Sequence, residues 1–279
     1  MSIDILTRVA PAADERIAYS NDPSQFGDLR LPKSTGPSPL VIVLHGGWWH
    51  SEADLAYLGH LAAALTGEGV ATWNVEFRRL GKTGGGWPAT FLDVVAAADY
   101  VPTLANRFPI DPTRVVALGH SAGGHLAMWL AARHRIPRDS PIYRAPALSL
   151  CGAISIAGAV DLRMAQSLGF RDGFENRLVV EDLLGGNPHD VPERYAAASP
   201  ADMLPLGIPQ VLLHGTADDI APIEITESYV RRARALGDPA TLVRIAQADH
   251  FDPIDPESHV FAYARDATKD LVAQPMGSS

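Results

Sequence analysis

The stretch Val115–Ala132, VVALGHSAGGHLAMWLAA, determines which fold this sequence can adopt. Its first part is apolar and rich in β-branched residues, and its second part carries apolar residues at helical spacing, so a buried strand is predicted to turn directly into a helix. Between them, residues 119–123 read GHSAG, a G-x-S-x-G pattern. A sharp turn of this kind crowds the residues two before and two after its serine, and only small side chains let the backbones pass. A serine that merely capped its helix would need neither glycine, so Ser121 is predicted to be a nucleophile.

Outward from this stretch, short β-rich runs alternate with longer helical ones from about residue 39 onward. Strands are predicted within 39–46, 69–75, 113–120, 150–158, 209–215 and 240–248, and helices within 54–69, 89–108, 121–134, 223–237 and 257–273. This alternation predicts an α/β fold, a mostly parallel twisted sheet with helices on both faces. Residues 15–20 and 26–32 are predicted to form an antiparallel pair at the edge of that sheet.

One segment, about 161–205, interrupts the alternation with several Gly and Pro residues and only short helical stretches. It is too long for a simple connection, and long insertions in compact domains are typically lids or binding loops. The sequence therefore predicts a single domain over residues 1–279 with a small lid insertion at about 161–205.

Composition narrows the classes of partner and the compartment. The 279 residues carry a formal net charge of -9, which argues against nucleic-acid binding because phosphate contacts need clustered Lys and Arg. We expect no membrane partner, because no apolar run approaches the roughly 18 residues that a membrane-spanning helix needs. The first 20 residues lack the apolar core of a secretion signal, and the single cysteine, Cys151, cannot form an internal disulfide. Both observations favour a cytoplasmic protein.

A second motif, VLHGGWWHS at Val43–Ser51, follows the first core strand. An acyl-transfer enzyme needs two or three N–H donors aimed at the oxygen of its tetrahedral intermediate, and glycine lets the backbone approach the substrate closely. The N–H groups of Gly47, Trp48 and Ala122 are the predicted oxyanion hole. His45 is predicted to support this loop by hydrogen bonding.

In α/β hydrolases the catalytic serine, acid and histidine follow one another in that order along the chain. Only two of the ten histidines, His250 and His259, come late enough. His250 follows the last predicted strand in a loop, where a base can reach across the strand ends. His259 is expected on the final helix, either at the surface or in a packing contact. His250 is the predicted base.

The acid must follow the strand within 209–215, so that its carboxylate can reach the imidazole of His250. Asp218 and Asp219, in the segment HGTADDIAP, both satisfy this condition. Chain order and strand placement do not separate the two.

The segments HGGWW, GHSAGGHLA and HGTADDIAP together resemble the α/β-hydrolase superfamily, over nearly the whole chain from about Arg16. More narrowly, the chain is similar to hormone-sensitive-lipase-like carboxylesterases, arylformamidases and prolyl-oligopeptidase-like hydrolases. The family pattern H-G-x-x-D-x-x-V-P, laid on residues 214–222, implies Asp218 as the acid and leaves Asp219 as a turn residue. Two departures from lipase-like esterases, Trp48 in place of a third glycine and His120 in place of Asp, are more similar to arylformamidases or feruloyl-esterase-like proteins.

The sequence thus predicts a serine hydrolase that cleaves carboxylic esters of small or aromatic acyl groups through an acyl-enzyme on Ser121. An arylformamidase or other amidase is the alternative, and a non-catalytic binding protein of the same fold is a remote one. We expect a small ester or amide substrate and neither metal nor cofactor, and a homodimer would be compatible with this function. The predicted pocket is lined by the aromatic residues Trp48, Trp49, Trp87, Phe170 and Phe174, although one of the two adjacent tryptophans is expected to pack in the core.

Overall fold

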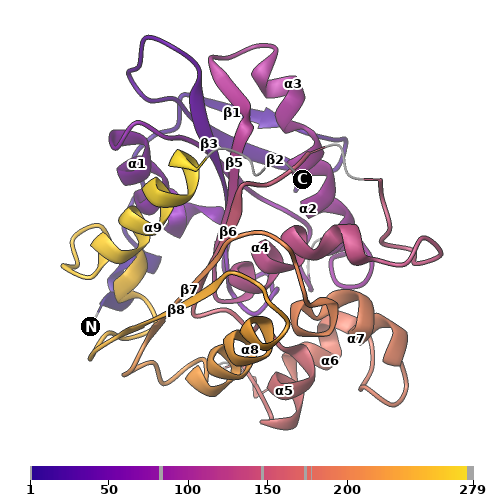
Figure 1. Cartoon of the computed structure of the whole chain (residues 1–279). Helices are drawn as coiled ribbons and strands as arrows, with labels where there is room; N and C mark the ends of the chain where they lie inside the picture. The colour runs from indigo at the N-terminus through magenta and orange to yellow at the C-terminus, as the bar shows by residue number, and fades with distance from the viewer. Residues whose placement is uncertain (1, 82–83, 146–147, 173–174, 177, 275–279) are drawn as a thin grey trace.

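The computed structural model describes residues 2–81, 84–145, 148–172, 175–176 and 178–274. An eight-stranded sheet runs through the centre of the molecule in the order β1-β2-β4-β3-β5-β6-β7-β8 (Figure 1). The pairs β1/β2 and β2/β4 are antiparallel, and every pair from β4 to β8 is parallel. The strands are β1 (Glu15–Ala18), β2 (Phe26–Arg30), β3 (Ser38–Leu44), β4 (Ala71–Val75), β5 (Ile110–His120), β6 (Gly152–Ile156), β7 (Gln210–Gly215) and β8 (Ala240–Ile245).

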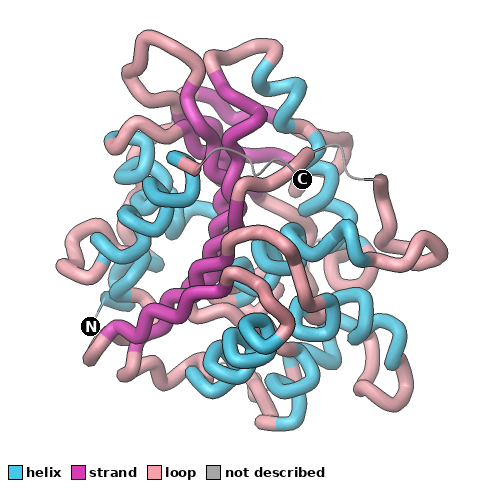
Figure 2. Tube along the Cα trace, viewed as in Figure 1, coloured by secondary structure: helices cyan, strands magenta, loops and turns pink. Residues whose placement is uncertain are grey.

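Helices cover both faces of the sheet (Figure 2). One face packs against α1 and α9, and its core includes Val41 and Val43 of β3. The opposite face packs against α2, α3, α4 and α8, and its core includes Leu40 and Ile42 of the same strand. The α-helices are α1 (Gly59–Gly67), α2 (Ala89–Asp99), α3 (Val101–Ala105), α4 (Ala122–Ala132), α5 (Leu162–Ser167), α6 (Val179–Leu184), α7 (Pro192–Ala198), α8 (Ile223–Ala235) and α9 (Phe261–Ala273). Short 3-10 helices are η1 (Ser2–Leu6), η2 (Leu55–Leu58), η3 (Arg133–Arg135), η4 (Pro200–Met203) and η5 (Asp252–Ile254).

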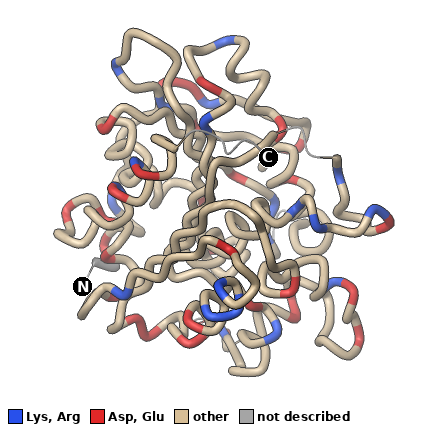
Figure 3. The backbone as a smooth tube through the Cα atoms, viewed as in Figure 1, with Lys and Arg blue, Asp and Glu red and all other residues tan. Residues whose placement is uncertain are grey.

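Alternate side chains of β3 point to opposite faces, and residues 40–44 are all buried because helices cover both faces, as expected for an interior parallel strand. Strands β3, β4, β6 and β7 contain no Asp, Glu, Lys or Arg, and the charged residues gather on the surrounding helices and loops (Figure 3). Within the described residues, no helix is long and apolar enough to cross a membrane.

The predicted fold class is confirmed, including the antiparallel edge pair formed by β1 and β2. Two predicted helices are each interrupted: residues 54–69 form η2 followed by α1, and residues 89–108 form α2 followed by α3. In the second case Pro102 lies at the start of α3, where a missing N–H costs nothing.

The described residues of the segment 161–205 form the short helices α5, α6 and α7, followed by η4. It is joined to α4 by buried hydrogen bonds: Trp129 Nε1 donates to the carbonyl oxygen of Ala197 at 2.9 Å, and His125 Nε2 lies 2.9 Å from that of Ala198. These contacts fix the end of the segment on α4, the helix that follows Ser121. A lid function of the segment stays a prediction.

The turn from β5 into α4 brings backbones together more closely than any side chain would allow. A Cβ atom at Gly119 would lie 2.0 Å from the carbonyl oxygen of Gly123, and one at Gly123 would lie 2.0 Å from that of Leu44 in β3. Both obstacles are backbone atoms, which cannot rotate away. The two glycines of the motif are therefore required by the packing of α4 against β5 and β3.

This packing predicts opposite effects for two Gly→Ala substitutions. Gly119→Ala should lower the free energy of unfolding by about 1–3 kcal/mol or more, because the new methyl group overlaps backbone. At Gly67, at the end of α1, nothing lies within 4 Å of the added carbon. Gly67→Ala should therefore raise the free energy of unfolding by about 0.4–1 kcal/mol, because alanine restricts the unfolded chain more than glycine does. Urea unfolding of both variants checks this, and equal effects would contradict it.

Candidate active site

Ser121 lies between the end of β5 and the first residue of α4, in a conformation rare for a residue with a side chain, with φ 55° and ψ -121°. Its N–H donates to the carbonyl oxygen of Ile156 at 2.8 Å, which ties the turn to the end of β6. Backbone strain of this kind persists only where the surroundings enforce it, and it concentrates at functional sites. The sharp turn predicted from the sequence is present.

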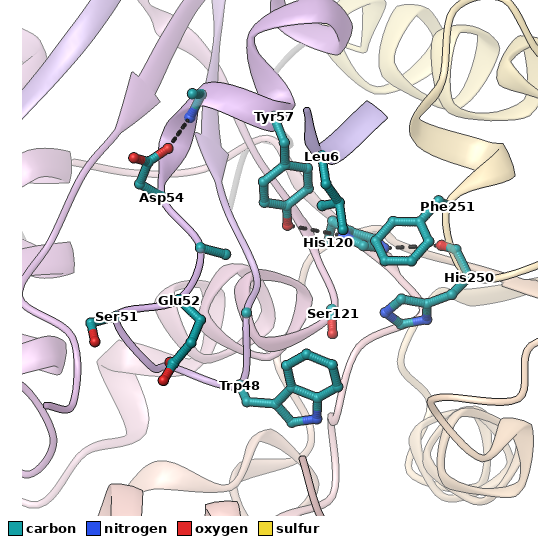
Figure 4. Close-up of a pocket in the computed structure, with 13 residues that line it drawn as sticks. Leu6, Trp48, Ser51, Glu52, Asp54, Tyr57, His120, Ser121, His250 and Phe251 are labelled. Carbon is teal, nitrogen blue, oxygen red and sulfur yellow. Dashed lines mark hydrogen bonds between the residues drawn. The ribbon is translucent and has the colours of Figure 1, made fainter. Parts of the chain in front are cut away.

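A pocket of about 350 Å³ opens beside Ser121 (Figure 4). His250 lines it together with Ser121, and the two side chains lie on facing sides with Trp48 beside them. Ser121 and His250 are not hydrogen-bonded to each other in the described chain; catalytic hydrogen bonds often tighten only when substrate binds. The lining residues are Leu6, Gly47, Trp48, Ser51, Glu52, Ala53, Asp54, Ala56, Tyr57, His120, Ser121, His250 and Phe251.

The imidazole of His250 is oriented by Asp218. Nδ1 of His250 lies 2.7 Å from Oδ2 of Asp218, and both side chains are buried. Since a carboxylate can only accept, Nδ1 carries the proton and donates it, which leaves Nε2 as the unprotonated nitrogen. This is the tautomer that a general base needs.

The Asp218 carboxylate is fully buried but well supplied with donors. Oδ1 accepts from the N–H groups of Ile220 and Ala221 at 2.9 Å, and Oδ2 lies 3.4 Å from Nε2 of His214. Burial acts to raise the pKa of Asp218, but the hydrogen bonds from His214 and His250 outweigh it and hold that pKa well below its usual range. The carboxylate therefore stays ionised at every pH at which the protein is expected to work.

The neighbouring residues considered in the sequence lie elsewhere. Asp219 is exposed, and His259 is exposed in a turn just before α9 rather than on that helix. The structure thus brings His250 together with Asp218 and leaves both Asp219 and His259 at the surface.

The loop after β3 is strained next to the pocket. Trp48 and Trp49 have positive φ values of 52° and 58°, which bulky residues rarely adopt. Gly47 and Trp48 line the pocket beside Ser121, and Ala122 is the first residue of α4, where an N–H has no acceptor within the helix. Gly47, Trp48 and Ala122 thus lie close to Ser121, and an oxyanion hole formed by their N–H groups stays a prediction.

Buried charges hold this loop in place. Nε2 of His45 lies 3.1 Å from Oε1 of Glu76, and the His45 ring stacks on Phe77 at a centroid distance of 4.3 Å. Nε of Arg79 lies 3.1 Å from the same carboxylate oxygen. Burial acts to raise the pKa of Glu76, but the charges of His45 and Arg79 outweigh it and lower that pKa. The supporting role predicted for His45 is confirmed.

The predicted aromatic lining requires correction. Trp49 is fully buried and donates from Nε1 to Nδ1 of His125 at 3.1 Å, so it belongs to the core. Phe170 is also a core residue, and Trp87 packs against Phe91 at a centroid distance of 5.6 Å. Trp49, Trp87 and Phe170 do not line the pocket described above. Phe174 lies outside the described residues. Trp48 is the predicted aromatic residue that does line it.

Several lining residues had no signal in the sequence. Leu6 and Phe251 come from opposite ends of the chain, and Tyr57 comes from η2. They meet only because the fold brings η1, η2 and the loop after β8 together beside the turn that holds Ser121. Glu52 and Asp54 add carboxylates to the lining. The described residues contain no group of three or more His, Cys, Asp or Glu that could hold a metal ion.

Together, the sheet order, the strained serine and the histidine–aspartate pair at the strand ends define an α/β hydrolase. The BD-FAE family model matches residues 28–232, and the chain belongs to this family.

Named relatives and solved structures agree with this class. The chain is 29% identical over 236 residues to esterase LipC of Mycobacterium tuberculosis, covering 79% of this chain and 55% of the relative. It is 25% identical over 253 residues to a probable isoprenylcysteine alpha-carbonyl methylesterase, ICMEL1, of Arabidopsis thaliana, covering 87% and 52%. The chain thus spans about half the length of these two relatives.

Among solved structures, a truncated carbohydrate esterase from gut microbiota aligns with a TM-score of 0.78 at 22% identity, covering 95% of this chain and 98% of the other. Esterase 2 of Thermogutta terrifontis, with propionate bound, aligns with a TM-score of 0.72 at 22% identity, covering 94% of each chain. At this identity the likeness shows the shared fold.

The two adjacent aspartates provide a direct test of the site. Asp218→Asn should lower kcat for an ester substrate by about 10⁴-fold, because the amide favours the wrong tautomer of His250. Asp219→Asn is the matched control and should leave kcat within about twofold, because Asp219 is exposed. Steady-state kinetics of both variants decide the matter, and a larger loss in Asp219→Asn would refute the assignment.

Proposed function

We propose that this protein is a serine carboxylesterase that hydrolyses esters of small or aromatic acyl groups. The observation that carries the proposal is the pocket shared by Ser121 and His250, with Asp218 hydrogen-bonded to His250 at 2.7 Å. The BD-FAE match and the relatives named as esterases support it. A cytoplasmic location is part of the proposal, supported by a single cysteine that cannot form a disulfide within the chain.

In the proposed reaction, Oγ of Ser121 attacks the ester carbonyl carbon while Nε2 of His250 takes the hydroxyl proton. The carbonyl oxygen becomes an oxyanion, stabilised by the N–H groups of Gly47, Trp48 and Ala122. The intermediate collapses as the C–O bond to the alcohol breaks, and His250 gives its proton to the departing alkoxide. A water molecule then attacks the acyl-enzyme, again losing a proton to His250, which returns it to Ser121 as the carboxylic acid leaves.

Asp218 stabilises the positive charge that His250 carries between these steps. Because the pKa of Asp218 is held low, the carboxylate does not take the proton itself. The pocket volume of about 350 Å³ suits a short acyl chain or a single aromatic ring, and its walls at Leu6, Trp48 and Phe251 are apolar.

A fluorophosphonate probe tests the nucleophile. We expect covalent labelling of the folded protein at one site, detected by intact mass, and no labelling of Ser121→Ala. The same substitution should lower kcat for p-nitrophenyl acetate by roughly 10⁵–10⁶-fold. Equal labelling of both proteins, or no labelling of the wild type, would refute the proposed enzyme. Measuring N-formylkynurenine and an aminoacyl anilide beside the p-nitrophenyl ester separates amidase from esterase activity. Faster turnover of either amide than of the ester would favour the alternative, an arylformamidase or other amidase.

Leu6 tests whether the acyl group occupies this pocket. Its side chain is 42% exposed, lines the pocket and lies near Phe251 (Figure 4). Leu6→Ala should increase the kcat/KM ratio of p-nitrophenyl hexanoate over acetate by about 10-fold, because added space for methylene groups is worth 1–3 kcal/mol. Leu6→Trp should decrease that ratio.

Val9→Ala is the control, because Val9 is 93% exposed and lies outside this pocket. If the Leu6 substitutions change preference among acetate esters of different alcohols instead, the pocket holds the alcohol and the acyl placement is wrong.

A further inference from the structure

A chain of buried hydrogen bonds joins the three loops that form the site, and none of its side chains takes part in the reaction proposed above. It runs from the backbone of Gly46 through the side chains of Tyr57 and His120 to the backbone of His250. Figure 4 shows the two hydrogen bonds that His120 makes in this chain. We propose that Tyr57 and His120 are positioning residues that hold the loop of His250 against the serine turn and the oxyanion loop. This inference rests on the proposed ester hydrolysis.

The direction of each hydrogen bond follows from the chemistry of its partners. Nε2 of His120 lies 3.0 Å from the carbonyl oxygen of His250, which can only accept, so Nε2 carries the proton. Nδ1 of a neutral His120 then accepts, and the Tyr57 hydroxyl 3.0 Å away donates to it. The Tyr57 oxygen in turn accepts from the N–H of Gly46 at 2.6 Å. The hydrogen bonds therefore all point the same way, from the N–H of Gly46 through Tyr57 and His120 to the carbonyl oxygen of His250.

This arrangement requires a neutral His120, and its surroundings keep it neutral. The side chain is fully buried against Tyr57, and burial is the main cause that lowers the pKa of His120 well below its usual value. The positive charge that His250 can carry lowers it further, while the charge of Asp218 acts in the opposite sense. Burial also raises the pKa of Tyr57, so its hydroxyl keeps the proton that it donates.

His120 also contacts the imidazole that it helps to place. The ring centroids of His120 and His250 are 4.6 Å apart, and Phe251 packs on both rings at 5.6 and 5.1 Å. Two hydrogen bonds also fix His250: its backbone carbonyl oxygen accepts from His120, and its Nδ1 donates to Asp218. With both points fixed, Nε2 is the one nitrogen free to face Ser121. Misplacement of a catalytic group by about 1 Å can cost about 100-fold in rate, so this second anchor matters for kcat.

The two ring nitrogens of His120 can be tested separately with a matched pair of substitutions. The amide of glutamine reaches the position of Nε2, so His120→Gln keeps a donor for the His250 carbonyl. The amide of asparagine reaches only the position of Nδ1, so His120→Asn keeps the contact with Tyr57 and loses the one with His250. Tyr57→Phe removes a single hydroxyl and leaves both Gly46 and His120 without their partner.

The experiment measures kcat and KM for p-nitrophenyl acetate, the rate of fluorophosphonate labelling of Ser121, and the thermal unfolding midpoint of each full-length variant. We expect His120→Asn and Tyr57→Phe to lower kcat and the labelling rate by about 10- to 100-fold with KM changed less than about threefold. We expect His120→Gln to recover most of the lost kcat although its unfolding midpoint is no higher than that of His120→Asn.

The proposal is overturned if His120→Gln and His120→Asn lose kcat equally, or if Tyr57→Phe folds and keeps the wild-type kcat and labelling rate. A fall in the unfolding midpoint without a change in kcat means that the chain is structural only, and also overturns it. Should neither His120 variant fold, Tyr57→Phe decides alone. A wild type that neither hydrolyses esters nor reacts with the probe refutes the proposed function itself, whereas an active wild type with unaffected variants refutes only this inference.

Discussion

The close contact between the serine turn and the sheet is the constraint on which the rest of this structure depends. Gly119, Gly123 and Leu44 bring three backbones to a separation that leaves no room for a Cβ atom. Ser121 is held in its strained conformation between them, with its N–H bonded to the end of β6. This conformation places the hydroxyl of Ser121 at the start of α4. There, the N–H groups of the first helical turn and the helix dipole favour negative charge.

Around this turn, the site is built from loops that follow different strands of the sheet. They are joined by buried polar groups that are shielded from water. These are the Asp218 carboxylate with its three hydrogen-bond donors, the Glu76 carboxylate with His45 and Arg79, and the chain through Tyr57 and His120. A buried polar group without a partner costs free energy, so each of these networks favours one arrangement of its loop over others. Preorganised donors and a fixed imidazole are the features that acyl transfer requires.

Much of this could be read from the sequence, because the responsible signals are local. Apolar alternation gave the order of strands and helices, and the spacing of Gly119, Ser121 and Gly123 gave the turn. The order of residues along the chain reduced ten histidines to two. It could not separate Asp218 from Asp219, since both follow the same strand; a family pattern favoured Asp218, and the folded chain places that carboxylate against His250 and leaves Asp219 exposed. Two of the aromatic residues predicted for the pocket, Trp49 and Phe170, lie in the core instead, because no local pattern distinguishes a core aromatic residue from one in a pocket wall.

The sequence by itself determined the fold class, the serine turn and the short set of residues from which a triad could be drawn, because hydrophobic periodicity and glycine spacing act over a few residues. Only the tertiary structure decided which side chains meet: Leu6 with Phe251 at the pocket, His45 with Glu76 beside the loop after β3, and Tyr57 with His120 and the backbone of His250. The physical reason is that hydrogen bonds and packing contacts depend on distance in space. Residues 57, 120 and 250 are far apart in the sequence. They become neighbours because the carboxyl ends of the parallel strands lie at the same edge of the sheet.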